Sequence, residues 1–194
     1  MWKRVGFVIV GFLVGAVGYW LWPENDQLPD LGKVEAFTLN TAEGQSYYID
    51  NNKLKLVTFF YTSCPDICPM TIKQISTLQP ELEKDGLFGR EVEFVAITFD
   101  PEVDTPARIQ AYAEHFQAST EGWVWLRGSV TETKRVTNMF QMIYQKQQDG
   151  SVAHGTTMYL LDENNHIRGI YDMAILDSPV DTAQILEDIK LLAD

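Results

Sequence analysis

The sequence predicts an α/β fold in which a mixed central sheet is flanked by helices. Runs of strand-forming residues alternate with segments of helical periodicity along most of the chain. Two apolar runs, residues 54–61 and 91–99, have the composition of strands that are buried on both faces. A hairpin pattern late in the chain adds antiparallel strands. With 194 residues, of which 45% are hydrophobic, the chain can form one domain and an appendage.

The appendage is residues 1–22, MWKRVGFVIVGFLVGAVGYWLW. Lys3 and Arg4 precede an uncharged run that is close to the length of a membrane-spanning helix and ends in aromatic residues. We expect an uncleaved transmembrane signal anchor. A cleaved signal peptide is the competing interpretation, because residues 15–18 are small. The sequence argues against a lipoprotein, since no cysteine lies near the end of the run.

The positive charges before the apolar run predict the orientation of the anchor. Lys3 and Arg4 favour the cytoplasmic side, which places the rest of the chain outside the cytoplasm. Residues 23–32, PENDQLPDLG, are typical of a tether, and residues 33–194 form the domain. Because no Arg- and Ser-rich presequence is present, we expect a single-pass protein of the bacterial inner (cytoplasmic) membrane rather than the mitochondrial one. The formal net charge of −12 argues against nucleic acid as a partner.

In the first half of the chain, two strand patterns flank the turn at residues 41–44 and predict a hairpin over residues 34–49. The buried strand at residues 54–61 is followed by residues 67–84, where apolar side chains recur at three- and four-residue spacings and predict a helix. After the second buried strand, Thr105-Pro106 opens another helix, with proline in its first turn.

The second half begins with a short strand at residues 123–126. Ser129 and Glu132 then form a capping box for a helix that we expect to reach about Ile143. The remaining elements are a hairpin of residues 157–162 and 166–172 and a final helix from Ser178-Pro179.

The two cysteines of the chain lie in FFYTSCPDICPM, residues 59–70, where a central strand meets a helix. The unpaired N–H groups of a first helical turn stabilise a thiolate. If the helix starts near Asp66, Cys64 and Cys68 lie close together on one side. A structural disulfide is one interpretation, but so small a loop constrains the unfolded chain little. The pair therefore indicates either dithiol–disulfide cycling or a soft-metal site.

A metal site would need a third ligand, and the chain has three histidines. His115 falls in a helical pattern and His166 beside a turn, where neither needs a special role. His154 lies in DGSVAHGTT, a glycine-flanked loop directly before a predicted strand, from which a side chain can be aimed into a site. By itself, however, such a histidine is more often idle than a ligand.

Three motifs together change that assessment. CPDICP follows the first buried strand, DPEVDTP (residues 100–106) follows the second, and His154 lies five residues before Tyr159. In this order they resemble the Sco/SenC family of copper-binding, membrane-tethered proteins with a thioredoxin-like fold, over most of residues 33–192. The resemblance implies that Cys64, Cys68 and His154 bind copper. Two thiolates suit Cu(I), and the imidazole helps to accept Cu(II).

The resemblance also implies supporting roles near the site for Asp100 and Asp104, although Asp104 could instead cap the helix that follows it. The sequence departs from the family pattern at Ala153 and Gly155, where aspartate and serine commonly flank the histidine. A hydrogen bond that supports the ligand is therefore missing from the expected place. Family members often have a phenylalanine–histidine or threonine–histidine pair directly before the first cysteine, and this chain has Thr62-Ser63 there.

What the resemblance implies is a copper metallochaperone, and not an enzyme, that delivers copper to the CuA centre of cytochrome c oxidase subunit II. Another copper chaperone or a thiol reductase is a further candidate partner. The alternative is a membrane-tethered thiol–disulfide oxidoreductase that uses Cys64 and Cys68 to reduce the CuA-site cysteines or other extracytoplasmic disulfides. The usual redox motif, however, has two residues between its cysteines rather than three, and residues 155–157 contain no counterpart of the thioredoxin cis-proline. A peroxidase that uses Cys64 alone would leave His154 without a role.

Overall fold

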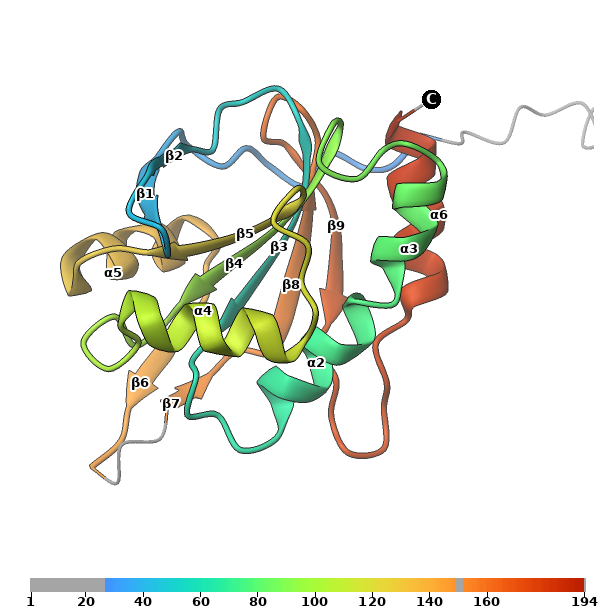
Figure 1. Cartoon of the computed structure of the whole chain (residues 1–194). Coiled ribbons are helices and arrows are strands. Elements are labelled where there is room, and N and C mark those ends of the chain that lie inside the picture. Colours follow the sequence, from blue (N-terminus) through green and yellow to red (C-terminus); the bar gives the residue numbers. More distant parts are fainter. Residues whose placement is uncertain (1–26, 149–151, 194) are drawn as a thin grey trace, which may run out of the picture.

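The computed structural model describes residues 27–148 and 152–193. Its centre is a seven-stranded sheet in the order β2-β1-β5-β4-β3-β8-β9 (Figure 1). The strands β3, β4 and β5 are parallel, and the other neighbours pair antiparallel, so the predicted mixed sheet is confirmed. The bounds are β1 Thr38–Thr41, β2 Ser46–Tyr48, β3 Leu54–Phe60, β4 Val92–Thr98, β5 Trp123–Arg127, β8 Thr157–Leu161 and β9 Ile167–Asp172.

Helices cover both faces of this sheet. They are α2 Ile67–Ile75, α3 Leu78–Lys84, α4 Pro106–His115, α5 Val130–Met139 and α6 Thr182–Ala193. Phe59 and Phe60 are consecutive in β3 and therefore point to opposite faces. Phe60 stacks on Tyr112 of α4, with ring centroids 5.5 Å apart, whereas Phe59 contacts Phe140 directly after α5 at 5.4 Å. Because α4 and α5 lie on opposite faces, every residue of β3 and β4 is buried, as their continuous apolar runs predicted.

The single helix predicted over residues 67–84 is wrong in one respect, because the segment forms two helices. Pro80 has no N–H to donate to the carbonyl of Ser76, and its ring would clash with that carbonyl in a continuous helix. The chain therefore turns at Ser76 and Thr77, and Pro80 falls in the first turn of α3, where proline is tolerated.

Two other helix bounds differ from the prediction. The capping box of Ser129 and Glu132 is confirmed, but α5 ends at Met139, because Gln141 adopts a left-handed φ of 52° and closes the helix. The last helix starts at Thr182 and not at Ser178, which instead pairs with Ile175 in an isolated bridge.

A second, two-stranded sheet was not predicted. It pairs β6 (Tyr144–Lys146) with β7 (Val152–His154), and the Asp149-Gly150 pair between them in the sequence is a turn signal that could have indicated it. In Figure 1 this hairpin lies near the end of the molecule where the turn into α2 also lies.

The predicted anchor, residues 1–22, lies outside the described residues. Within residues 27–148 and 152–193, no helix combines the length and the apolar character needed to cross a bilayer. The described end of the predicted tether lies beside β9. The N–H of Leu31 donates to the carbonyl of Ile167, and Arg168 donates to the carbonyls of Leu28 and Pro29.

Candidate metal centre

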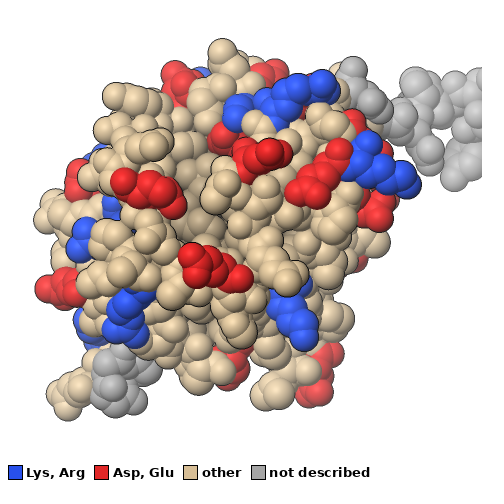
Figure 2. All heavy atoms as spheres, viewed as in Figure 1, with Lys and Arg blue, Asp and Glu red and all other residues tan. Residues whose placement is uncertain are grey.

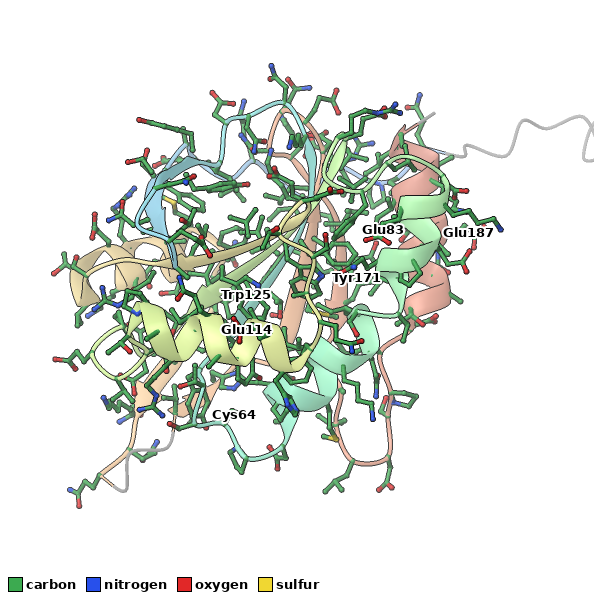
Figure 3. The ribbon with its side chains drawn as sticks, in the orientation of Figure 1. Cys64, Glu83, Glu114, Trp125, Tyr171 and Glu187 are labelled. Carbon is green, nitrogen blue, oxygen red and sulfur yellow. The ribbon has the colours of Figure 1, made fainter. Side chains whose placement is uncertain are left out.

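Cys64 lies where β3 leads into α2 (Figure 3), and Cys68 is the second residue of that helix. The side chain of Asp66 caps α2 by accepting from the N–H of Ile67, so Cys68 falls in the first helical turn. The backbone N–H of Cys68 donates to Cys64 Sγ at 3.4 Å. Both cysteines are free; Cys68 is buried and Cys64 is half-buried. The predicted position of the pair at a strand-to-helix junction is confirmed.

His154 reaches the cysteines from the other side, as the last residue of β7 rather than from a loop. Its Nδ1 lies 2.6 Å from the carbonyl oxygen of Gly155. The N–H of Gly155 in turn donates to the carbonyl of Ile143, just before β6. With Nδ1 engaged, Nε2 is the ring nitrogen available as a ligand.

The two sulfurs and an imidazole nitrogen of His154 all lie within 4.8 Å of one another. The fold therefore brings together the three side chains that the motifs singled out, from segments some 90 residues apart in sequence. Two sulfur ligands and one nitrogen ligand form a donor set that suits a soft transition-metal ion. His115, exposed on α4, and His166, paired with Asp30 at 2.8 Å, are not part of this cluster.

The two thiols have opposite pKa shifts. A hydrogen bond from the Cys68 thiol lowers the pKa of Cys64 to about 4, with further help from His154 and the N–H of Cys68, while burial opposes the shift. The same hydrogen bond raises the pKa of Cys68, as do its burial and the charge of Cys64. Burial lowers the pKa of His154, but its hydrogen bonds to Cys64 and to Gly155 outweigh this and raise it. The reduced site thus holds one thiolate and one thiol at neutral pH.

Asp104 is not a helix cap, because Thr105 caps α4 by accepting from the N–H of Arg108. The fully buried carboxylate of Asp104 accepts instead from the backbone N–H of Thr62 at 3.2 Å and from its hydroxyl at 2.5 Å. The hydroxyl of Thr98 at the end of β4 also donates to it. Asp104 therefore holds the segment that leads to Cys64.

Asp100 lies at the same end of β4 and is also buried, at 5% exposure. Its Oδ1 lies 2.8 Å from Nζ of Lys146 in β6, the strand that pairs with the one carrying His154. Neither aspartate lies in the cluster of candidate ligands. Sequence reasoning missed Lys146, since no local pattern marks a lysine whose partner is 46 residues away.

The fold and site together define a thioredoxin-like α/β protein with two cysteines and a histidine grouped as candidate metal ligands. The family model SCO1/SenC matches residues 26–193, and the chain belongs to this family.

Several solved structures resemble the chain, among them the following three. A SCO1/SenC family lipoprotein from Bacillus anthracis is 27% identical, with a TM-score of 0.75 over 84% of this chain and 95% of that one. Arabidopsis thaliana ScoI with copper bound is 28% identical, with a TM-score of 0.68 over 82% and 99%. BsSco, a member of the Sco family of cytochrome c oxidase assembly proteins with a disulfide switch, is 25% identical, with a TM-score of 0.72 over 86% and 98%.

Proposed function

We propose that this protein binds one copper ion through Cys64, Cys68 and His154 and delivers it to the CuA site of cytochrome c oxidase subunit II. The grouping of two sulfur donors and one imidazole nitrogen within 4.8 Å is the observation that carries the proposal. Two relatives support it. Arabidopsis ScoI has a structure with copper bound, and BsSco is a member of the Sco family of cytochrome c oxidase assembly proteins.

The exposure of the ligands suits a carrier. Cys64 and His154 are half-buried, so a ligand of the acceptor can enter before the old ligands leave. Cys68 is a buried thiol whose raised pKa keeps it protonated, and coordination of copper therefore expels its proton. Two thiolates hold Cu(I), and the imidazole extends the site to Cu(II).

We further propose that residues 1–22 anchor the chain in a bacterial inner membrane, with residues 23–32 as a tether and residues 33–194 as the domain outside the cytoplasm. The positive residues before the apolar run support this orientation. That a relative is a lipoprotein is consistent with attachment to a membrane by different chemistry.

A thiol–disulfide oxidoreductase is the second candidate, favoured by the thiolate of Cys64 beside the thiol of Cys68. In that reaction the Cys64 thiolate would attack a substrate disulfide and release one substrate thiolate. Cys68 would then lose its proton and attack Cys64 in the mixed disulfide, which forms the Cys64–Cys68 disulfide and releases the second substrate thiolate. His154 would have little part in it. The histidine therefore separates the two functions.

The test is a titration of the reduced full-length chain with copper, followed by absorption and electron paramagnetic resonance. We expect one equivalent of Cu(II) to give an intense thiolate-to-copper charge-transfer band, which His154→Ala loses and the control His115→Ala keeps. Equal copper affinity in His154→Ala would rule out the three-ligand site. If copper only oxidises the pair to a disulfide, copper carriage is wrong and the reductase becomes the function to assay. Appearance of the CuA signal in the reduced apo-domain of subunit II would test delivery.

A further inference from the structure

Two buried aspartates lie on one short turn between β4 and α4, and each contacts a different segment next to the candidate ligands. Asp104 bonds the N–H and the hydroxyl of Thr62, two residues before Cys64. Asp100 bonds Lys146 in the hairpin that carries His154. The hydroxyl of Thr98 donates to the carboxylate of Asp104 and accepts from the backbone N–H of Asp100, so it fixes the turn without contacting the Asp100 side chain.

The β6–β7 hairpin needs an anchor outside itself. Each strand has three residues, and among the described residues neither strand pairs with the central sheet. An isolated two-stranded hairpin is marginally stable in water. The orientation of His154 therefore depends on contacts between the hairpin and the rest of the domain.

Two contacts with the end of β4 contribute to that anchor, beside Tyr61 directly after β3, whose ring centroid lies 6.1 Å from that of His154. The ring of Phe99 packs against Tyr144 at 5.1 Å and against His154 at 4.8 Å, and these two residues face each other in the hairpin register. The ion pair of Asp100 and Lys146 lies two residues further along β6, about 7 Å away at the usual rise of a strand. Two separated contacts prevent the hairpin from pivoting about one of them.

We propose that the β4–α4 turn is a bracket that positions the two halves of the copper site independently, through Asp104 for the cysteine segment and Asp100 for the histidine hairpin. This inference rests on the proposed function. Both aspartates are positioning residues that act through Thr62 and Lys146. Loss of the Asp100 contact affects the imidazole, and so Cu(II), whereas loss of the Asp104 contact affects the thiolates and so both oxidation states.

The first experiment compares Asp100→Asn with Glu102→Gln in the reduced full-length chain. Glu102 is the matched control, since it lies 3.8 Å from the same Lys146 but is exposed. We expect Asp100→Asn to weaken Cu(II) binding about 10-fold, the size usual for residues that orient metal ligands, with Cu(I) affinity unchanged. Lys146→Met should weaken Cu(II) binding as much as Asp100→Asn does, whereas Lys146→Arg, which keeps the charge, should bind Cu(II) like wild type. The double variant Asp100→Asn with Lys146→Met should bind Cu(II) no more weakly than either single variant. Equal Cu(II) affinity in Asp100→Asn and Glu102→Gln would overturn the proposed positioning of the hairpin by Asp100.

The second experiment measures hydrogen exchange in the protein without copper. Asp100→Asn should speed exchange of the Gly155 amide, which donates to the carbonyl of Ile143 in the hairpin, and leave the amides of Thr62 and Cys64 unchanged. Asp104→Asn should do the reverse and weaken Cu(I) and Cu(II) binding together. Thr62→Val, which removes only the hydroxyl, is the second variant if Asp104→Asn does not fold. If either substitution speeds exchange in both the cysteine segment and the histidine hairpin, the two halves of the site are not positioned independently.

The two proposals fail in distinguishable ways. If the wild-type chain takes up no copper, the proposed function is wrong, but the exchange pattern still supports or refutes the bracket. If the wild-type chain binds copper and Asp100→Asn changes neither Cu(II) affinity nor exchange, only the bracket is wrong.

Discussion

The imidazole ring of His154 lies against the phenyl ring of Phe99, with centroids 4.8 Å apart and 34° between the ring planes. Phe99 is buried and also stacks on Phe59 in β3, with centroids 5.2 Å apart. A candidate metal ligand at the surface is thus connected through one side chain to the core of the sheet.

Phe99→Leu should therefore lower both stability and Cu(II) affinity. We expect a loss of about 1–3 kcal/mol in the free energy of unfolding, as for other changes that open a gap in a core. Chemical denaturation and copper titration measure the two effects. Phe88→Leu is the control, because Phe88 is buried near the opposite end of β4 and contacts Phe94. It should cost similar stability with no change in Cu(II) binding; an equal loss of copper affinity would contradict a local role for Phe99.

The reactivity of Cys64 should persist in acid. Because its pKa is lowered to about 4, the thiolate is present at neutral pH and is lost only as the pH falls through that value. An ordinary cysteine loses its thiolate below about pH 8.5. Alkylation of Cys64 by iodoacetamide should therefore be nearly as fast at pH 6 as at pH 8, and should fall towards pH 4.

Substitutions beside Cys64 should shift the pH midpoint of its alkylation in a fixed order. The hydrogen bond from Cys68 is the largest cause of the lowered pKa, so Cys68→Ala should raise the midpoint most and His154→Ala less. In urea the midpoint should return to the ordinary range. A midpoint that is the same in folded and unfolded protein would be inconsistent with the described hydrogen bonds.

Gly155 allows Met142 to occupy the space beside His154. A Cβ added at Gly155 would lie 2.8 Å from Met142 Sδ, and Met142 is buried. Gly155→Ala should cost about 1 kcal/mol in the free energy of unfolding, because the flexible but buried side chain of Met142 must move. Met142→Ala opens a cavity of its own, but in its presence Gly155→Ala should cost less than in wild type, so that thermal unfolding of the double variant shows a loss smaller than the sum of the two single losses. Additive losses would show that the steric contact is not the cause. Serine, which is common in the family at this position, would meet the same sulfur.

Lys55, a buried residue of β3 outside the candidate metal centre, should make the stability of the fold depend on pH. Burial lowers the pKa of this β3 lysine to about 8 from its ordinary 10.5, so the unfolded chain holds the proton more tightly. Stability should therefore rise as the pH increases from about 8 to 10.5. Lys55→Met removes this contribution, and its stability relative to wild type should be higher at pH 7 than at pH 10. Urea unfolding at both values measures it, with exposed Lys84→Met as control; parallel profiles of wild type and Lys55→Met would disprove it.

Local patterns predicted most of the fold. The apolar runs of β3 and β4, the capping box of α5 and the late hairpin are each visible within a few neighbouring residues. The split between α2 and α3 also has a local cause in the sequence, because Pro80 cannot continue the first helix.

The sequence by itself determined the mixed α/β class and the place of the cysteine pair, because residue periodicity and the strand-to-helix junction are local properties of the chain. Only the tertiary structure decided how the site is completed. Asp104 meets Thr62 across 42 residues and Asp100 meets Lys146 across 46, while His154 is positioned by a hairpin packed on Phe99. Such contacts depend on how the strands are ordered in the sheet, and no local pattern of residues encodes that order.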